Sequence, residues 1–186
     1  MVNRDKLIYI FVTLAVLIAG FFLYRHYSRP VMKPSGAQGQ NMAKADLIDF
    51  SFNPGKISVA NGGDFTIDVM IDPAKHKVSN ADLIFSFDQT KMKLTSISQS
   101  EKFTQVLFSK TDTEGIASYS AATGFENTIA AKAAFATLHF HALEKADGST
   151  ITIDQKKSGI YADDNPGINK LGVSGPATIS ITDQAK

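Results

Sequence analysis

Apolar and polar residues alternate strictly in many segments of the chain after residue 46. The run from Phe65 to Asp72 has Phe, Ile, Val and Ile at every second position. On a pleated strand this period of two sends one set of side chains to the core and the other to solvent. Strands with one solvent-exposed face are typical of antiparallel sheets packed face to face, and not of a parallel α/β sheet. The same period recurs in residues 48–53, 82–88, 138–142, 150–153 and 178–182.

Turn signals separate these segments, among them Asn53-Pro54-Gly55 and Asn61-Gly62-Gly63-Asp64. Glycine supplies positive φ, proline presets φ, and Asp or Asn side chains bond the nearby backbone. Their spacing predicts an all-β fold, an antiparallel jelly-roll-like β-sandwich of about eight to ten strands spanning residues 46–186. Helix is scarce in this part. One candidate is Asp88 to Lys93, where Asp88 caps a single turn; the other is Thr128 to Ala134, with the alternative that it leads directly into the next strand.

An uncharged apolar run, Leu7 to Tyr24, precedes the alternating part. At about 1.5 Å per residue its helix is about 27 Å long, close to the ~30 Å thickness of the hydrocarbon layer. The run predicts a single transmembrane helix at residues 7–24, with residues 1–6 as a short flank. The competing interpretation is a cleaved signal peptide, but apolar residues continue to Tyr24 beyond the small Gly20, without a small-x-small site at the polar boundary.

Residues 25–45 contain prolines, glycines and glutamines without apolar periodicity. They predict a flexible linker; an ordered extension packed on the domain is the alternative. The large C-terminal region, residues 46–186, has room for one core and not for two ordinary domains.

Charge and composition exclude some functions. The chain has 19 Lys and Arg residues and 18 Asp and Glu residues. Residues 1–45 contain 6 of the basic and 1 of the acidic residues, a net charge of +5. Residues 46–186 contain the other 13 basic and 17 acidic residues, a net charge of −4. The mildly acidic domain lacks the basic stripe that nucleic acid requires, so we expect no nucleic-acid partner. There is no cysteine, hence neither a disulfide framework nor lipoprotein-type attachment. The nucleophile-elbow and phosphate-loop motifs are also missing from the sequence.

The order of these elements resembles a cohesin-type module, a sandwich related to several carbohydrate-binding modules. The resemblance covers about residues 46–182, and another β-sandwich, such as an immunoglobulin-like adhesin domain, is the alternative. The first matching feature is Gly62-Gly63-Asp64 before FTIDVMID (Phe65 to Asp72). The second is Asn80-Ala81-Asp82, which opens LIFSFDQTKMKLTSI (Leu83 to Ile97) with its Phe87-Asp88 pair. The others are the segments FATLHFHAL (Phe135 to Leu143), ADGSTITI (Ala146 to Ile153) and ATISIT (Ala177 to Thr182).

The resemblance implies a non-catalytic recognition module that binds a dockerin-like protein or a polysaccharide. It implies no partner-contacting residue, because those surfaces vary within the family. The chain has no Trp, the residue that most often stacks on sugar rings, which disfavours polysaccharide. The resemblance and the apolar run together predict a single-pass membrane protein whose large C-terminal domain is extracytoplasmic. Basic residues flank the run on both sides, so their distribution does not decide the orientation.

Two other functions compete with recognition. The first is a structural subunit of a cell-envelope assembly, in which the small residues Ala15, Ala19 and Gly20 help the apolar helix to pack against other subunits. The second is an enzyme, which requires a pocket of convergent polar residues that the sequence does not reveal. We therefore expect no catalytic residue and no obligatory cofactor.

Four residues are candidate metal ligands. His139 and His141 are two positions apart on a strand and so share a face, as two ligands of Zn²⁺ would, with two solvated histidines as the plain alternative. Asp163 and Asp164, with Asn165, offer oxygen atoms for calcium, but an Asp/Asn run before Pro-Gly is more often a turn.

Two further groups of residues have a plain and a functional interpretation. The paired carboxylates of a glycosidase could come from Asp68, Asp72, Asp82 and Asp88. Their alternation with apolar residues favours instead that they are solvent-exposed residues of strands. Residues 103–108, FTQVLF, form either another core strand or a binding rim whose exposed Phe or Leu anchors a partner.

Overall fold

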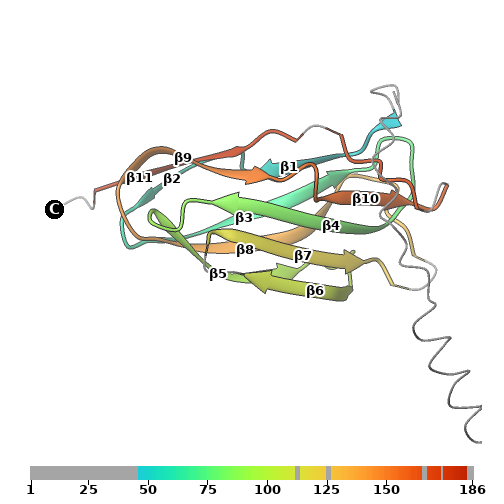
Figure 1. Cartoon of the computed structure of the whole chain (residues 1–186), viewed down its shortest axis with the longest axis horizontal. Coiled ribbons are helices and arrows are strands. Elements are labelled where there is room, and N and C mark those ends of the chain that lie inside the picture. Colours follow the sequence, from blue (N-terminus) through green and yellow to red (C-terminus); the bar gives the residue numbers. More distant parts are fainter. Residues whose placement is uncertain (1–45, 112–113, 125–126, 165–166, 173, 184–186) are drawn as a thin grey trace, which may run out of the picture. The chain divides into compact units, whose positions relative to one another are not determined.

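The alternating segments form strands, and the strands form two sheets (Figure 1). The computed structural model describes residues 46–111, 114–124, 127–164, 167–172 and 174–183. Within these residues the strands are β1 (Asp49–Asn53), β2 (Lys56–Ala60), β3 (Asp64–Asp72), β4 (Val78–Phe87), β5 (Met92–Gln99), β6 (Gln105–Thr111), β7 (Ile116–Ala122), β8 (Ala133–Ala142), β9 (Ala146–Ile153), β10 (Gly159–Ala162) and β11 (Ala177–Thr182).

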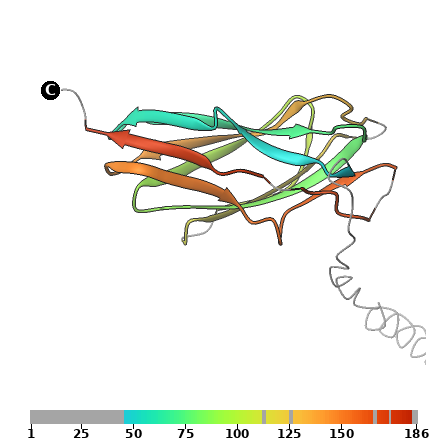
Figure 2. The ribbon, with the colours of Figure 1, turned by 90° about the horizontal axis from the view of Figure 1, so that it is seen from above.

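The smaller sheet has the order β1-β3-β8-β5 and is antiparallel throughout. The larger sheet has the order β2-β11-β9-β4-β7-β6, and β10 also pairs with β4. The two sheets pack as two layers, as Figure 2 shows from above. The predicted all-β sandwich is therefore confirmed.

Two details of the prediction need correction. Within the described residues there are eleven strands rather than eight to ten, and β2 runs parallel to β11, so the larger sheet is mixed. The division of the first extended segment into two strands has a local cause. Pro54 and Gly55 divide one extended stretch into β1, which joins the smaller sheet, and β2, which joins the larger one. Proline offers no backbone N–H to a ladder, so the chain changes sheet there.

The core lies between the sheets and consists of the apolar members of the alternating segments. In β3 the side chains of Phe65, Ile67, Val69 and Ile71 are all buried. The ring of Phe135 in β8 is fully buried at the centre of an aromatic cluster. Its centroid lies 4.8 Å from that of Phe103, 5.4 Å from that of Tyr119 and 5.5 Å from that of Phe50.

Neither short helix candidate becomes a helix. At Asp88 the predicted cap is present, since its Oδ1 accepts the backbone N–H of Thr90 at 2.9 Å. The chain makes only one turn there, because Met92 already begins β5. In the segment from Thr128 to Ala134, Ile129 exchanges two backbone hydrogen bonds with Val78 and β8 begins at Ala133. The alternative, that this segment leads into a strand, is confirmed.

The predicted transmembrane helix, Leu7 to Tyr24, and the predicted linker, 25–45, lie outside the described residues. In the part of the chain that the structure describes, no helix has the length and apolar composition needed to cross a membrane. The membrane span at residues 7–24 stays a prediction.

Candidate functional site

Large apolar side chains gather on the surface of β6. In the described part of the chain, four large apolar residues are clearly exposed, and three of them are consecutive: Val106, Leu107 and Phe108, exposed by 43%, 60% and 51%. Single exposed apolar residues are ordinary on a protein surface, whereas contiguous ones indicate an interaction site. This cluster is the first sign of a functional surface.

The pairing of β6 with β7 decides which way these side chains point. Val106 pairs with Ala121 and Phe108 with Ser120, so Leu107 is the extra residue of a β-bulge. Ala121 is buried and belongs to the core side of β7, while Ser120 belongs to the outer side. Phe108 therefore lies on the outer face of the larger sheet.

The same face continues across β7, β4 and β9. Its outward side chains alternate with buried ones in each of these strands. We call this surface the large-sheet face; it comprises Asp82, Ile84, Ser86, Phe108, Lys110, Ile116, Ser118, Ser120, Thr150 and Thr152.

One hollow of about 360 Å³ lies on the large-sheet face beside Phe108. Its lining includes the apolar residues Ile84 and Phe108, the small residues Ser118 and Ser120, and the charged residue Lys157. The hydroxyl of Ser120 donates a hydrogen bond to Oδ1 of Asp82. A lining that combines apolar and polar residues is usual at protein-binding surfaces.

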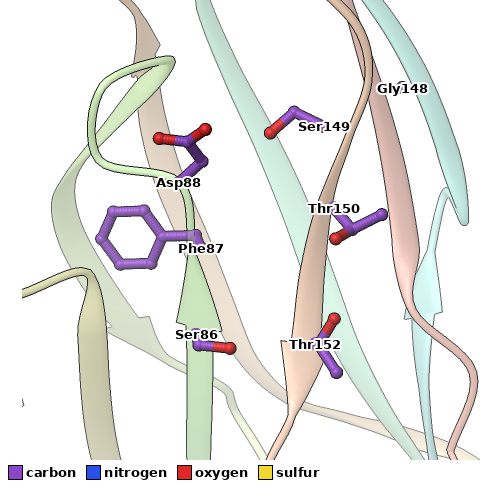
Figure 3. Close-up of a pocket in the computed structure, with 7 residues that line it drawn as sticks. All are labelled: Ser86, Phe87, Asp88, Gly148, Ser149, Thr150 and Thr152. Atoms are coloured by element: carbon purple, nitrogen blue, oxygen red, sulfur yellow. The ribbon is translucent and has the colours of Figure 1, made fainter.

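A second hollow of about 350 Å³ lies where β4 ends beside β9 (Figure 3). Hydroxyls from both strands line it, with Ser86 directly opposite Thr152 in the register. The carboxylate of Asp88 completes the lining. A hydrogen bond from the Thr90 hydroxyl, and then one from the Thr90 backbone N–H, hold the pKa of Asp88 below its usual range. This end of the face therefore offers hydroxyls and a negative charge.

The outer face of the smaller sheet is different, because its polar side chains bond one another. His141 Nδ1 lies 2.7 Å from Asp64 Oδ1, and His139 Nε2 lies 2.9 Å from Ser98 Oγ. The hydroxyl of Thr137 donates to Asp68 Oδ1 at 2.6 Å. We call this surface the small-sheet face.

The candidate zinc ligands His139 and His141 thus share a face, as their spacing predicts, and each has a hydrogen-bond partner there. The calcium candidate Asp164 already has partners within the protein, since its Oδ2 lies 3.0 Å from His76 Nδ1 and 3.2 Å from Lys170 Nζ. Asp163 follows β10, with its backbone N–H bonded to Lys77 O, and Asn165 lies outside the described residues. Among the described residues, no three His, Cys, Asp or Glu side chains are grouped as a metal site requires.

The four aspartates considered as glycosidase acids do not converge. Asp68 and Asp72 belong to β3 in the smaller sheet, whereas Asp82 and Asp88 belong to β4 and its end in the larger sheet. Because packed sheets are about 10 Å apart, the sandwich separates the two pairs.

The segment FTQVLF combines both interpretations offered for it. Phe103 is fully buried against Phe135, as a core residue would be, while Leu107 and Phe108 are exposed, as a binding rim would be. The sequence pattern did not indicate that Ile84 and Lys157 line a hollow on the large-sheet face, nor that His76 is buried. The available signal was the run Val106-Leu107-Phe108, three consecutive apolar residues that depart from the alternation of a strand with one solvent-exposed face.

A family model described as Cohesin domain matches residues 50–179. The chain belongs to the cohesin family. The cohesin resemblance is thereby confirmed, over nearly the range expected. No curated protein sequence matches the chain.

Solved cohesin structures share the fold. The solution structure of CaCohA2 from Clostridium acetobutylicum is 17% identical and covers 75% of this chain and 94% of that one, with a TM-score of 0.66. The Coh-OlpC-Doc435 complex, a type I cohesin–dockerin complex from Clostridium thermocellum, is 13% identical over 74% of this chain and 94% of that one, with a TM-score of 0.62. A non-cellulosomal cohesin from the archaeon Archaeoglobus fulgidus is 17% identical over 74% and 93%, with a TM-score of 0.60.

Proposed function

We propose that this cohesin domain is a non-catalytic recognition module that binds a dockerin-like protein through the large-sheet face. Family membership supports the kind of partner, because cohesins of this fold are known in complexes with dockerins. The observation that carries the choice of face is the exposed side chain of Phe108, which lines a hollow together with Ile84 on the outer side of the larger sheet.

The composition of the face suits a protein partner. A few large apolar side chains at the centre of an interface provide most of its binding energy, and polar groups around them exclude water and set specificity. Here Phe108 and Ile84 form the apolar centre. Ser118 and Ser120 are small, so a partner's backbone can approach closely, and an apolar side chain of the partner fills the space between them.

Charged groups at the rim add specificity. Lys157 and Asp82 both line the hollow, and the hydroxyl of Ser120 already donates a hydrogen bond to the Asp82 carboxylate. A partner that places an apolar side chain in the hollow and a complementary polar group beside Asp82 satisfies both kinds of contact. Electrostatic complementarity of this kind selects partners more than it raises affinity.

The test is capture with paired variants. The piece Ala45 to Lys186 is immobilised as wild type, as Phe108→Asp and as Thr66→Asp, and is exposed to lysate and wall polysaccharide from the source organism; captured proteins are identified by mass spectrometry. Thr66 is the matched control, because it is exposed on β3 in the small-sheet face. We expect a dockerin-bearing protein on the wild type and on the control, and a loss of affinity of about 30-fold or more for the Phe108 variant.

Other outcomes would replace the proposal. Retention on polysaccharide alone would favour carbohydrate binding. Equal capture by the Phe108 and Thr66 variants would reject the large-sheet face. Neighbours recovered only with the full-length chain extracted from membranes would favour a structural subunit of a cell-envelope assembly.

The proposal includes a membrane anchor at Leu7 to Tyr24, with the domain on the extracytoplasmic side. Eighteen uncharged apolar residues suit one pass through a bilayer. A linker of about 20 residues has a reach of roughly 25 Å, which is enough to present the domain above the lipid headgroups. Fractionation and protease accessibility test both points: the full chain should resist alkaline extraction and should lose its domain to external protease, whereas residues 46–186 alone should remain in the soluble fraction.

A further inference from the structure

The hollow where β4 ends beside β9 is lined mainly by oxygen-bearing side chains (Figure 3). These are one carboxylate and four hydroxyls: Asp88, Ser86, Ser149, Thr150 and Thr152. Phe87 and Gly148 complete the lining, so Asp88 supplies its only charge and no lining side chain contains nitrogen. Figure 3 shows the hydroxyl of Ser86 pointing from β4 toward Thr152 on β9. The hollow is therefore rich in hydrogen-bond acceptors.

These acceptors keep free capacity within the protein. Among the described residues, none of the four hydroxyls has a hydrogen-bond partner. Thr90 donates two hydrogen bonds to Asp88, and both reach the same carboxylate oxygen, Oδ1, at 2.9 Å from the backbone nitrogen and 2.7 Å from the hydroxyl. A carboxylate has about four lone-pair sites, so Asp88 can accept further hydrogen bonds from a ligand.

The negative charge of the hollow is not neutralised by an ion pair. Hydrogen bonds from Thr90 hold the pKa of Asp88 below its usual range, so the carboxylate is ionised at neutral pH. In the part of the chain that the structure describes, no basic side chain forms an ion pair with Asp88. The charge of Lys91 also lowers the pKa of Asp88, but the ammonium group of Lys91 bonds Oε2 of Glu144 at 2.7 Å.

A cationic N–H group matches this set of oxygens best. Hydrogen bonds from an ammonium or guanidinium group to a carboxylate are shorter and stronger than those between neutral groups. The charge of Asp88 disfavours an anion. The lining also offers no aromatic surface on which a sugar ring could stack, because the ring of Phe87 packs edge-on against Phe140, with 5.3 Å between the centroids.

We propose that this hollow receives an arginine or lysine side chain of the protein that docks on the large-sheet face. The inference rests on the proposed function, since it adds one contact to the same docking face. Ser86 lies two residues beyond Ile84 on β4, so the two hollows are centred about 7 Å apart along the strand. A partner that fits both carries a basic side chain at roughly this distance from its apolar anchor.

The first test needs no natural partner. N-acetyl-arginine amide is titrated into the ¹⁵N-labelled full chain in mild detergent, with N-acetyl-citrulline amide as the uncharged analogue of similar shape. We expect saturable shifts of the amide signals of Asp88, Gly148 and Ser149 with the arginine derivative alone. The shifts should disappear in Asp88→Asn and persist in Asp163→Asn, which removes an exposed carboxylate just after β10.

Other results of this titration would overturn the assignment. Equal shifts with both derivatives, or no shifts at these three amides, would show that the hollow does not select a cation. Shifts caused at the same amides by a cello-oligosaccharide, without an effect of the arginine derivative, would assign the hollow to carbohydrate.

The captured partner gives the second readout. Calorimetric titration should show about tenfold weaker binding to Asp88→Asn than to the wild type, and the difference should shrink at high salt, which screens the charge. Unchanged affinity for Asp88→Asn beside a loss for Phe108→Asp would reject the basic side chain and keep the docking face. Equal binding of the Phe108 and Thr66 variants would reject the face and with it the partner's place in the hollow, and the arginine derivative then reports on the hollow alone.

Discussion

The outer faces of the two sheets share one core but meet solvent in different ways. On the small-sheet face the polar side chains bond one another, as His141 does with Asp64 and Thr137 with Asp68. On the large-sheet face Phe108 exposes apolar surface beside one hollow, and a second hollow lies where β4 ends beside β9. A face whose groups already have partners gains little from another protein, whereas an exposed apolar centre with a polar rim gains much.

The difference arises without any change in the strand pattern. Both sheets are built from strands that alternate between core and solvent positions. What differs is the choice of outward residues: long polar groups that reach one another on β3 and β8, against small hydroxyls and occasional apolar residues on β4 and β7. The fold thus fixes two faces, and the outward residues decide which of them binds.

The largest expected effect is on stability and comes from a substitution in the core that supports both faces. Phe135→Ala deletes the ring that contacts Phe50, Phe103 and Tyr119. We expect a loss of about 3–5 kcal/mol in the free energy of unfolding, because the buried cluster cannot fill the space. Urea unfolding measures it, with Phe135→Leu as the milder comparison. Equal stability of the two variants would contradict the central place given to this ring.

A bulky substitution should lower the affinity for the partner on one face and not on the other. Ser118→Arg fills the hollow between Ile84 and Phe108 on the large-sheet face and should lower the affinity for the captured partner about 30-fold. Ser96→Arg places the same residue on exposed β5 of the small-sheet face and should change the affinity less than twofold. Calorimetric titration measures both. A larger effect from the Ser96 variant would reverse the assignment of the faces.

A polar change should affect stability and leave binding alone. Thr137→Val removes the hydroxyl that donates to Asp68 on the small-sheet face. We expect a cost of about 1 kcal/mol in the free energy of unfolding and an unchanged affinity for the partner. Thr66→Val on the neighbouring strand β3 is the control. Lost binding without lost stability would show that the small-sheet face takes part in recognition.

The smallest effect concerns the acidic end of the large-sheet face. Thr90→Val removes the hydroxyl that donates to Asp88 at 2.7 Å and is the main cause of the lowered pKa of Asp88. We expect this pKa to rise in the variant. A carboxyl whose pKa is lowered by folding stabilises the protein above its unfolded pKa, and this stabilisation is lost as pH falls through the folded value. An NMR titration of Asp88 measures the change, and an unaltered pKa would contradict the assigned cause.

Much of the fold follows from local pattern, and the exceptions depend on pairing over long distances. The strict alternation of Phe65 to Asp72 predicts β3 and its buried residues because a strand's period is local. The parallel pairing of Lys56–Ala60 with Thr178–Thr182 joins segments more than a hundred residues apart, and neither segment encodes it. The scarcity of helix in the described residues, the turns and the sandwich were therefore predictable, and the mixed sheet was not.

The site was predictable only in part, for the same reason. The apolar stretch from Phe103 to Phe108 suggested a rim, but the bulge at Leu107 and the position of Phe108 opposite Ser120 are set by β7. The contacts of His76 have no local signal at all, because its partners are Asp46 and Asp164, 30 and 88 residues away.

The most direct test of the two-face account is hydrogen exchange of the domain with and without its captured dockerin-bearing partner. The account predicts slower exchange in the complex at amides of β4, β6, β7 and β9, with β3, β5 and β8 unchanged. Slower exchange confined to β3, β5 and β8 would contradict it and would assign recognition to the small-sheet face.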